Sequence, residues 1–138
     1  MEMNRREFVI AAAAAAACGC QGQSSEQREM ATIQPTVIDA GLAADFQAPG
    51  IYDTYRNRGF FVVCKAGSLR VVSSMCTHRN CRLKLAPDRS SFVCKCHGST
   101  FDENGHVTQG PAVRDLPHFE YAVNDQQHLS VHVGKVAR

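Results

Sequence analysis

Two short loops of this 138-residue chain carry cysteine and histidine at spacings that suit metal chemistry. They are CTHRNC at 76–81 and CKCHGS at 94–99. Each loop offers one cysteine and one histidine as candidate ligands: Cys76 with His78, and Cys94 with His97. Iron in an iron–sulfur cluster accepts thiolates and neutral imidazoles, and two of each complete the coordination of two sulfide-bridged irons. The loops therefore predict one 2Fe-2S cluster held by both pairs.

Two other uses of these side chains stay open on the residues alone. Zinc also binds cysteine and histidine, but its ligand pairs usually leave two to four residues in between. The single residue between Cys76 and His78 is short for that spacing. A scaffold of disulfides would use the cysteines and leave both histidines without a role. The pattern favours a cluster over a zinc-binding structural module or a disulfide framework.

The double motif resembles the cluster loops of the Rieske family of iron–sulfur proteins, over roughly residues 35–138. Within that family it resembles the high-potential branch, which has a disulfide between the two loops. The resemblance implies a Rieske-type 2Fe-2S cofactor and a disulfide between Cys81 and Cys96. Histidine ligation lowers the negative charge of the cluster, so its potential spans about −150 to +300 mV, against about −400 mV for the plant type.

The resemblance also assigns roles around the cluster. Ser99 would donate its hydroxyl hydrogen toward a bridging sulfide, and Gly98 would let the backbone approach the cluster. Gly110, Pro111 and Ala112 resemble the proline loop that covers the third side of the cluster. Phe101 stands where respiratory members have tyrosine, so this chain lacks a hydroxyl there. We expect a lower reduction potential than in the tyrosine-bearing relatives.

Arg79 stands where the first loop of respiratory members usually has leucine. Leucine suits an apolar quinone pocket, whereas arginine suits an acidic protein partner or an anionic substrate site. Arg79 therefore predicts docking to a redox protein in a reaction that slows as salt rises, with a solvated rim of basic residues as the alternative. The stretch between Cys76 and His97 contains one acidic residue, Asp88, and five basic residues: Arg79, Arg82, Lys84, Arg89 and Lys95.

Residues 1–20 look like an export signal. Arg5 and Arg6 precede an apolar stretch, Phe8–Cys20, as in a twin-arginine signal. As a helix this stretch would extend about 20 Å, short of the roughly 30 Å hydrocarbon core of a membrane. It therefore fits the apolar region of a signal peptide, with an alanine-rich soluble helix as the alternative.

Two cysteines at the end of this segment raise a second processing route. Cys18 or Cys20 follows small residues and could be the lipid-modified first residue of a lipoprotein, whereas ordinary cleavage would leave a soluble protein. Residues 21–32 are polar and predict a flexible linker. The Rieske domain is then expected at 33–138.

From residue 33 onward the sequence predicts strands and turns. Gly59–Cys64 and Ser68–Ser73 flank Lys65–Gly67, a hairpin pattern with glycine in the turn. Glu120–Val123 and His128–Val133 form a second hairpin pattern. No segment has a convincing helical period. We expect an all-β fold of small antiparallel sheets with the cluster loops at one tip, as the resemblance also implies. Shorter strands are predicted at Thr36–Asp39 and Ile51–Tyr55.

Composition and motifs together narrow the function. A formal net charge of +2 predicts no nucleic-acid partner, and the loops contain no hydrolytic constellation. The chain is expected to be an exported one-electron carrier, in the periplasm or on the outer face of the cytoplasmic membrane, and not a complete enzyme by itself. It would be a subunit or partner of a quinol–cytochrome c oxidoreductase, receiving electrons from quinol or passing them to a cytochrome.

Two alternatives use the same cluster in other assemblies. One is the small Rieske subunit of a molybdenum oxidase resembling arsenite oxidase, which also travels by the twin-arginine route. The other is the Rieske ferredoxin that serves a ring-hydroxylating dioxygenase. Cys81 and Cys96 disfavour the ferredoxin, because that branch lacks the disulfide and stays in the cytoplasm.

Overall fold

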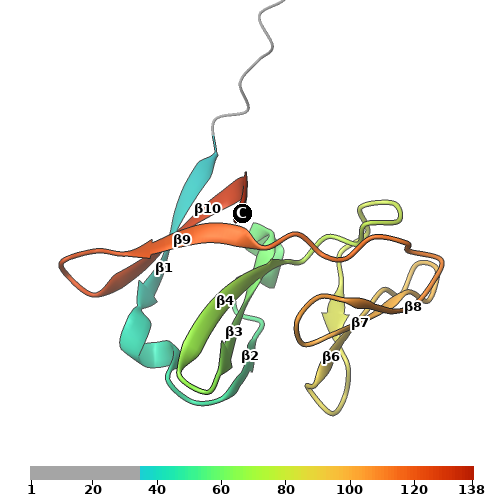
Figure 1. Ribbon diagram of the computed structural model, residues 1–138, viewed down its shortest axis with the longest axis horizontal. Coiled ribbons are helices and arrows are strands. Elements are labelled where there is room, and N and C mark those ends of the chain that lie inside the picture. Colours follow the sequence, from blue (N-terminus) through green and yellow to red (C-terminus); the bar gives the residue numbers. More distant parts are fainter. Residues whose placement is uncertain (1–34) are drawn as a thin grey trace, which may run out of the picture. The chain divides into compact units, whose positions relative to one another are not determined.

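The computed structural model describes residues 35–138, which form an all-β fold. Ten strands make three small antiparallel sheets, so the predicted fold class is confirmed (Figure 1). The predicted signal and linker, with Cys18 and Cys20, lie outside the described residues. Within the part that is described, no helix has the length and apolar character needed to cross a membrane.

The first sheet is built on the first predicted hairpin. Strand β3 (Phe60–Lys65) pairs with β4 (Ser68–Ser73), and β2 (Gly50–Tyr52) pairs with the other edge of β3. The two turn residues, Ala66 and Gly67, have φ values of 50° and 75°. A two-residue turn with positive φ at both positions has a twist that matches the flanking strands. The sequence pattern was therefore correct for this hairpin.

The second sheet joins the two ends of the described chain. Strands β9 (Phe119–Val123) and β10 (His128–Val136) form the second predicted hairpin, and β1 (Thr36–Leu42) pairs with the other edge of β10. Two short 3₁₀ segments, Ala43–Phe46 and Arg56–Arg58, were not predicted. Each is about one turn long, too short to produce a periodic signal in the sequence.

The third sheet carries the second cysteine–histidine loop and is preceded by the first. Figure 1 shows it to one side of the other two sheets. The loop at 76–81 leads into its first strand, and the loop at 94–99 connects its second and third strands. Its four short strands are β5 (Lys84–Leu85), β6 (Ser91–Val93), β7 (Thr100–Asp102) and β8 (Val107–Gln109).

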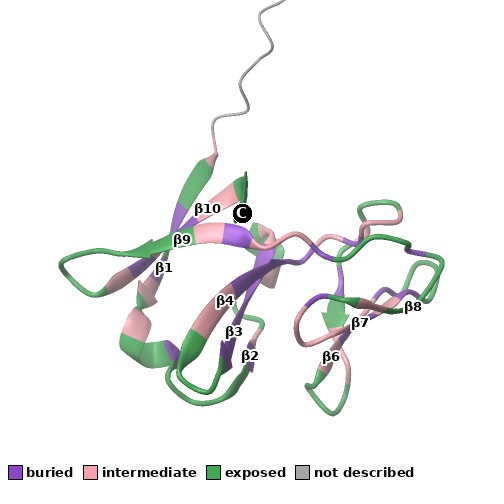
Figure 2. Ribbon diagram, in the orientation of Figure 1, coloured by how far each residue is buried: buried purple, intermediate pink, exposed green. Residues whose placement is uncertain are grey.

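Strand β3 divides its side chains between two apolar cores. Successive side chains of a strand point to opposite faces, so a run buried on both faces is apolar throughout. Phe60 packs into a core with Leu129, and Phe61 packs into another core that includes Cys76 and Cys94. Figure 2 shows the buried positions concentrated along β3 and β4. The second core therefore holds one cysteine from each cluster loop.

Candidate metal centre

The first loop is a hairpin connection closed by its own backbone. The N–H of Leu83 donates to the carbonyl of Ser74 at 2.8 Å at its base. Within the loop, the carbonyl of Cys76 accepts a bond from the N–H of Asn80 at 2.8 Å. The N–H of Cys76 donates to the carbonyl of Cys81 at 2.8 Å. The loop therefore wraps around the peptide groups of its first cysteine.

The second loop repeats this pattern on a different pair of strands. It starts where Val93 of β6 lies opposite Thr100 of β7. The carbonyl of Cys94 accepts a bond from the N–H of Gly98 at 3.0 Å, and the N–H of Cys94 donates to the carbonyl of Ser99 at 2.8 Å. The hydrogen-bonded positions are spaced as in the first loop. The two loops are thus equivalent backbone scaffolds that carry different side chains.

Both loops need a residue that tolerates a left-handed backbone at the same position. Asn80 has a φ of 55° and Gly98 a φ of 83°. Asparagine and glycine are the residues that adopt this conformation most readily. A Cβ at Gly98 would meet nothing within 4 Å among the described atoms, so its backbone angle is the constraint that the structure shows. The predicted close approach of Gly98 to a cluster stays a prediction.

Of the four candidate ligands, Cys76 and Cys94 occupy equivalent positions in the two loops, whereas His78 follows its cysteine by two residues and His97 by three. Cys76 and Cys94 are free thiols, each only 1% exposed. The rings of His78 and His97 lie edge to face, with centroids 4.9 Å apart. Among the described residues, the Nδ1 atom of His78 is the one buried side-chain nitrogen or oxygen without a hydrogen-bond partner. Buried polar atoms normally have partners, so this nitrogen fits a metal ligand. The donor set of two thiols and two imidazoles matches a Rieske cluster.

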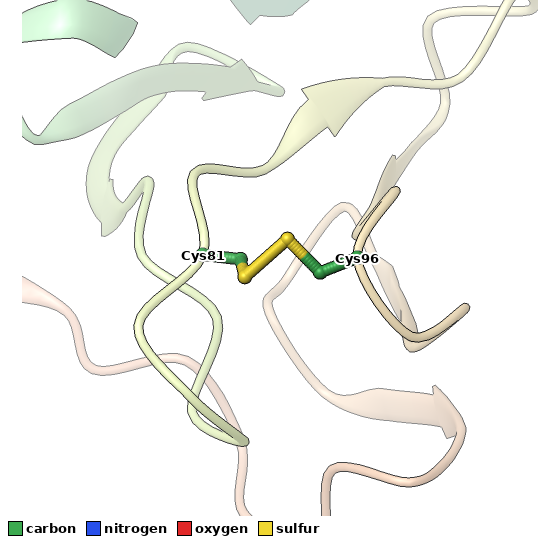
Figure 3. Close-up of a disulfide and its surroundings, with 2 residues drawn as sticks. All are labelled: Cys81 and Cys96. Atoms are coloured by element: carbon green, nitrogen blue, oxygen red, sulfur yellow. A yellow bond between two sulfur atoms is a disulfide. The ribbon is translucent and has the colours of Figure 1, made fainter.

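The predicted disulfide between Cys81 and Cys96 is present and joins the two loops (Figure 3). Their Cα atoms are 6.5 Å apart. The sulfur of Cys94 lies within 4.8 Å of both disulfide sulfurs, so these three sulfurs form a compact group. A disulfide sulfur has no thiolate to offer a metal. The group is therefore not itself a ligand set, and the thiols left for iron in the two loops are Cys76 and Cys94.

A third segment, which starts at Gly110 and Pro111, is fastened to both loops. The buried Ser99 Oγ accepts a hydrogen bond from the N–H of Ala112 at 3.0 Å. The hydroxyl of Thr77 donates to the carbonyl of Arg114 at 2.5 Å, and the Arg114 guanidinium donates to the carbonyl of Thr77 at 3.4 Å. The sequence analysis missed Thr77 and Arg114. Contacts between a side chain and a distant main chain leave no pattern in a single sequence.

Phe101 lies in the apolar core that also holds two candidate ligands, Cys76 and Cys94. It is fully buried in the same apolar cluster as Cys76 and Cys94, and it lies opposite Phe92 in the β6–β7 pair. The core that holds both thiols therefore includes an aromatic side chain without a hydroxyl. The effect expected on the potential stays a prediction.

Four of the five basic residues noted in the sequence are divided between the two loops and a separate hollow. Arg79 and Lys95 are exposed on the two loops, and Arg114 is exposed on the third segment. The stretches 76–81, 94–99 and 109–114 contain no acidic residue. A separate hollow of about 400 Å³ has charged residues of both signs in its wall: Asp53, Arg56, Lys84 and Arg89. We name the exposed Arg79, Lys95 and Arg114 the tip bases.

The other histidines with described contacts pair with oxygen atoms of the fold. Nδ1 of His106 lies 3.2 Å from Asp102, Nε2 of His118 lies 2.7 Å from the carbonyl of Asn104, and His128 contacts a carboxylate at 2.8 Å. Burial raises the pKa of Asp102, but hydrogen bonds from His106 and Asn104 outweigh it and hold this pKa below its usual value. These interactions stabilise turns and strand ends.

Fold and site together define a small all-β protein with two cross-linked cysteine–histidine loops. Residues 27–120 match the family model of the Rieske [2Fe-2S] domain. The chain therefore belongs to the Rieske family, and its cofactor is a 2Fe-2S cluster.

Individual relatives agree with this family. The cytochrome b6-f complex iron-sulfur subunit of Prochlorococcus marinus (strain MIT 9515) is 37% identical over 58 residues, which are 42% of this chain and 33% of that protein. The crystal structure of the plasma membrane Rieske protein PetC3 from Synechocystis PCC 6803 superposes with a TM-score of 0.52 and 32% identity, over 68% of this chain and 97% of that one.

A more distant structure shares the fold alone. It is a chain from a complex of oxygenase and ferredoxin in carbazole 1,9a-dioxygenase, with a TM-score of 0.52 and 22% identity over 74% of this chain and 96% of that one. The matches to the curated relatives span a third or less of the length of those proteins.

Proposed function

We propose that the cluster is held by one cysteine and one histidine from each loop: Cys76, His78, Cys94 and His97. The observation that carries this proposal is the donor set, in which two buried free thiols accompany two facing imidazoles. The unpaired, buried Nδ1 of His78 supports it further. When bound, the cluster supplies reversible uptake of one electron at a potential raised by its two neutral ligands.

The surrounding residues of the chain position these ligands and keep water away. Cys76 and Cys94 sit in an apolar core, where their sulfurs are shielded from solvent. The disulfide holds the two loops together, and the Ser99 hydroxyl fixes the third segment while its own hydrogen stays free to donate. The site is therefore preorganised by contacts that do not depend on a partner.

The proposed role is that of an exported carrier that works in or beside a quinol–cytochrome c oxidoreductase. The likeness to a cytochrome b6-f iron-sulfur subunit and to a plasma membrane Rieske protein supports this assignment. The disulfide disfavours the role of a ferredoxin for a ring-hydroxylating dioxygenase, because that branch of the family has no disulfide between the loops. Export rests on residues 1–20, with cleavage or a lipid on Cys18 or Cys20, followed by the linker 21–32 and the Rieske domain 33–138.

Arg79 supports a second candidate, the small subunit of a molybdenum oxidase. The tip bases are three exposed positive charges, accompanied by one exposed acid, Asp115, which follows Arg114 and lines a hollow with Thr77 and Asn80 of the first loop. The sum of these charges is positive. Such a surface suits an acidic protein partner better than an apolar quinone pocket. In this role the chain would accept electrons from the oxidase and pass them to a cytochrome.

Membranes from cells that lack this chain test the leading role. Quinol-dependent reduction of cytochrome c should fall when the chain is absent and return with the wild type. His97→Ala should fail to restore it, whereas His106→Ala, a histidine outside the loops, should restore it. If membranes without this chain oxidise quinol at an unchanged rate but the cells lose a molybdenum oxidase activity, the second candidate is favoured instead.

A further inference from the structure

The hollow of about 400 Å³ has no residue of the two cysteine–histidine loops in its wall. Its wall comes from the segment after β2 and from β5 with the turn that follows. Three side chains of the wall are cationic and one is a carboxylate: Arg56, Lys84 and Arg89, with Asp53. The rest of the wall adds no charge: Leu85, Ala86 and Pro87. We name this feature the basic hollow.

Two cations of the basic hollow are held in place by main-chain carbonyls. Nε of Arg56 donates to the carbonyl of Leu83. The guanidinium of Arg89 donates to the carbonyl of Ile51 at 2.9 Å. A guanidinium has five N–H donors, so each arginine keeps donors for a ligand after these bonds are made. Because the two side chains are already positioned, binding a ligand costs little further side-chain ordering.

The basic hollow has more positive charge than its own acid can neutralise. Asp53 lies 3.5 Å from the guanidinium of Arg89, so the carboxylate in the wall is already paired. Among the described residues, neither Arg56 nor Lys84 forms an ion pair with a carboxylate. Asp88 precedes Arg89 in the chain but is not part of the wall, and its carboxylate accepts hydrogen bonds from a neighbouring serine. Three cations against one acid leave an excess of two positive charges in the wall.

We propose that the basic hollow binds a small anion that bears a phosphate group. A phosphate monoester carries a charge of about −1.5 to −2 at pH 7, which matches the excess of positive charge. The planar forks of Arg56 and Arg89 suit two phosphate oxygens at once, and Lys84 adds a point charge. The apolar part of the wall can contact the organic part of such a ligand. This binding uses none of the proposed cluster ligands and goes beyond the proposed electron-carrier role.

The basic hollow is connected to the base of the first loop. Arg56 contacts the carbonyl of Leu83 through its side chain, and the Ser74 hydroxyl donates to the carbonyl of Arg56 at 2.8 Å. The N–H of Leu83 donates to the carbonyl of Ser74 at 2.8 Å. These contacts exist only in the folded chain, so phosphate should bind the folded state alone. At ten times its dissociation constant it should lower the ratio of unfolded to folded protein about elevenfold.

Equilibrium dialysis of the full, cluster-bound chain against ³²P-labelled inorganic phosphate tests the proposal. Sodium chloride keeps the ionic strength constant across the titration, so that general screening does not change with phosphate. The wild type should show one saturable site. Denaturant unfolding of the same samples should show a stabilisation that follows the binding curve.

Two variants of the wall should change the affinity in opposite directions. Lys84→Gln removes an exposed cation and should weaken phosphate binding about two- to fivefold, the range expected for one exposed charge pair. Asp53→Asn removes the one acid of the wall and frees Arg89, so it should strengthen binding by a similar factor. Arg82→Gln is the matched control, because Arg82 is exposed and basic but does not line the basic hollow. Its affinity for phosphate should equal that of the wild type.

Three outcomes would overturn the proposal. The first is phosphate uptake that does not saturate, and the second is an equal loss of affinity in Lys84→Gln and Arg82→Gln, which would show a general charge effect. The third is binding to phosphatidylglycerol vesicles without binding of inorganic phosphate, which would make this surface a membrane contact. Iron content and the spectrum of each sample test the proposed function separately, because phosphate binding does not involve the cluster ligands.

Discussion

Ser99 Oγ accepts a hydrogen bond from the main-chain N–H of Ala112 at 3.0 Å, and both residues are buried. The bond connects the second cysteine–histidine loop to the segment that begins at Gly110 and Pro111. A serine hydroxyl that accepts one hydrogen bond can still donate its own hydrogen. The donation predicted for Ser99 toward a bridging sulfide is therefore compatible with its role in holding this segment.

Ser99→Ala should destabilise the protein. The substitution leaves the buried N–H of Ala112 without a partner, which costs about 1–3 kcal/mol. Denaturant unfolding of the cluster-bound protein measures the loss. Ser90→Ala is the matched control, because Ser90 is exposed and its hydroxyl bonds to the adjacent Asp88. Equal stability of the two variants would show that the Ser99 hydrogen bond does not contribute to the free energy of unfolding.

Asp102→Asn should lower stability at neutral pH and have less effect in acid. Asp102 accepts bonds from the main-chain N–H groups of Asn104 and His106, at 2.8 and 2.9 Å. These bonds hold its pKa below the usual value, against the opposing effect of burial. The stabilisation is complete above the unfolded-state pKa of about 3.9 and is lost as pH falls through the lower folded-state pKa.

The difference between wild type and Asp102→Asn is expected to be about 0.5–1.5 kcal/mol at pH 7, reduced by solvent screening of this partly exposed group. Unfolding curves collected from pH 7 down to the acid limit of the fold measure it. Asp125→Asn, in the exposed turn between β9 and β10, serves as the control. A difference that grows as the pH falls would have the wrong sign for this explanation.

Much of the fold could be predicted because its strands carry local signals. The apolar run of β3, followed by glycine in a tight turn, was sufficient for the first hairpin, and the paired segments Glu120–Val123 and His128–Val133 indicated the second. The pairing of β1 with β10 could not be predicted, since Thr36 and Val133 lie opposite each other at the two ends of the described chain. Partners so far apart in sequence leave no local pattern.

The candidate site likewise has parts that could be predicted from the sequence and parts that depend on contacts between distant residues. The cysteine and histidine spacing was sufficient to propose the cluster, and the resemblance supplied the Cys81–Cys96 disulfide. The two hydrogen bonds between Thr77 and Arg114 could not be predicted from the sequence, because each joins a side chain to a main-chain carbonyl 37 positions away. Arg114 consequently joined the tip bases only once the fold was known. The boundaries at residues 20 and 32 stay predictions.

Phe101→Tyr should raise the midpoint potential of the cluster. Phe101 shares a core with Cys76 and Cys94. The resemblance to tyrosine-bearing members implies that a hydroxyl at this position donates to a ligand sulfur. A hydrogen bond to a charged group contributes about 1.5–3 kcal/mol, or roughly 60–130 mV for one electron, and partial replacement by water favours the lower end. Potentiometric titration measures the shift. Phe101→Leu, which adds no hydroxyl, should give no increase; a lower or unchanged value for the tyrosine variant contradicts this account.

Arg79→Glu should slow electron transfer to an acidic partner protein. Attraction between opposite charges accelerates encounter and weakens with salt. Stopped-flow rates at several ionic strengths should therefore decline for the wild type, and they should be lower and less salt-dependent for Arg79→Glu. Lys84→Glu makes the same charge change at the separate hollow and should have a smaller effect. A flat salt response, or faster quinol oxidation by the wild type than by Arg79→Leu, would count against the protein partner.

The central claim is that two histidine nitrogens and two cysteine sulfurs hold the cluster. Electron paramagnetic resonance of the reduced protein, with nitrogen hyperfine detection after ¹⁵N-histidine labelling, tests it most directly. We predict about two irons per chain, a rhombic signal with the low average g of nitrogen-ligated clusters, and two coupled nitrogens. His106→Ala should retain both couplings, whereas His78→Ala and His97→Ala should lose the signal or one coupling. Zinc in place of iron, or a cluster without nitrogen coupling, would contradict the assignment.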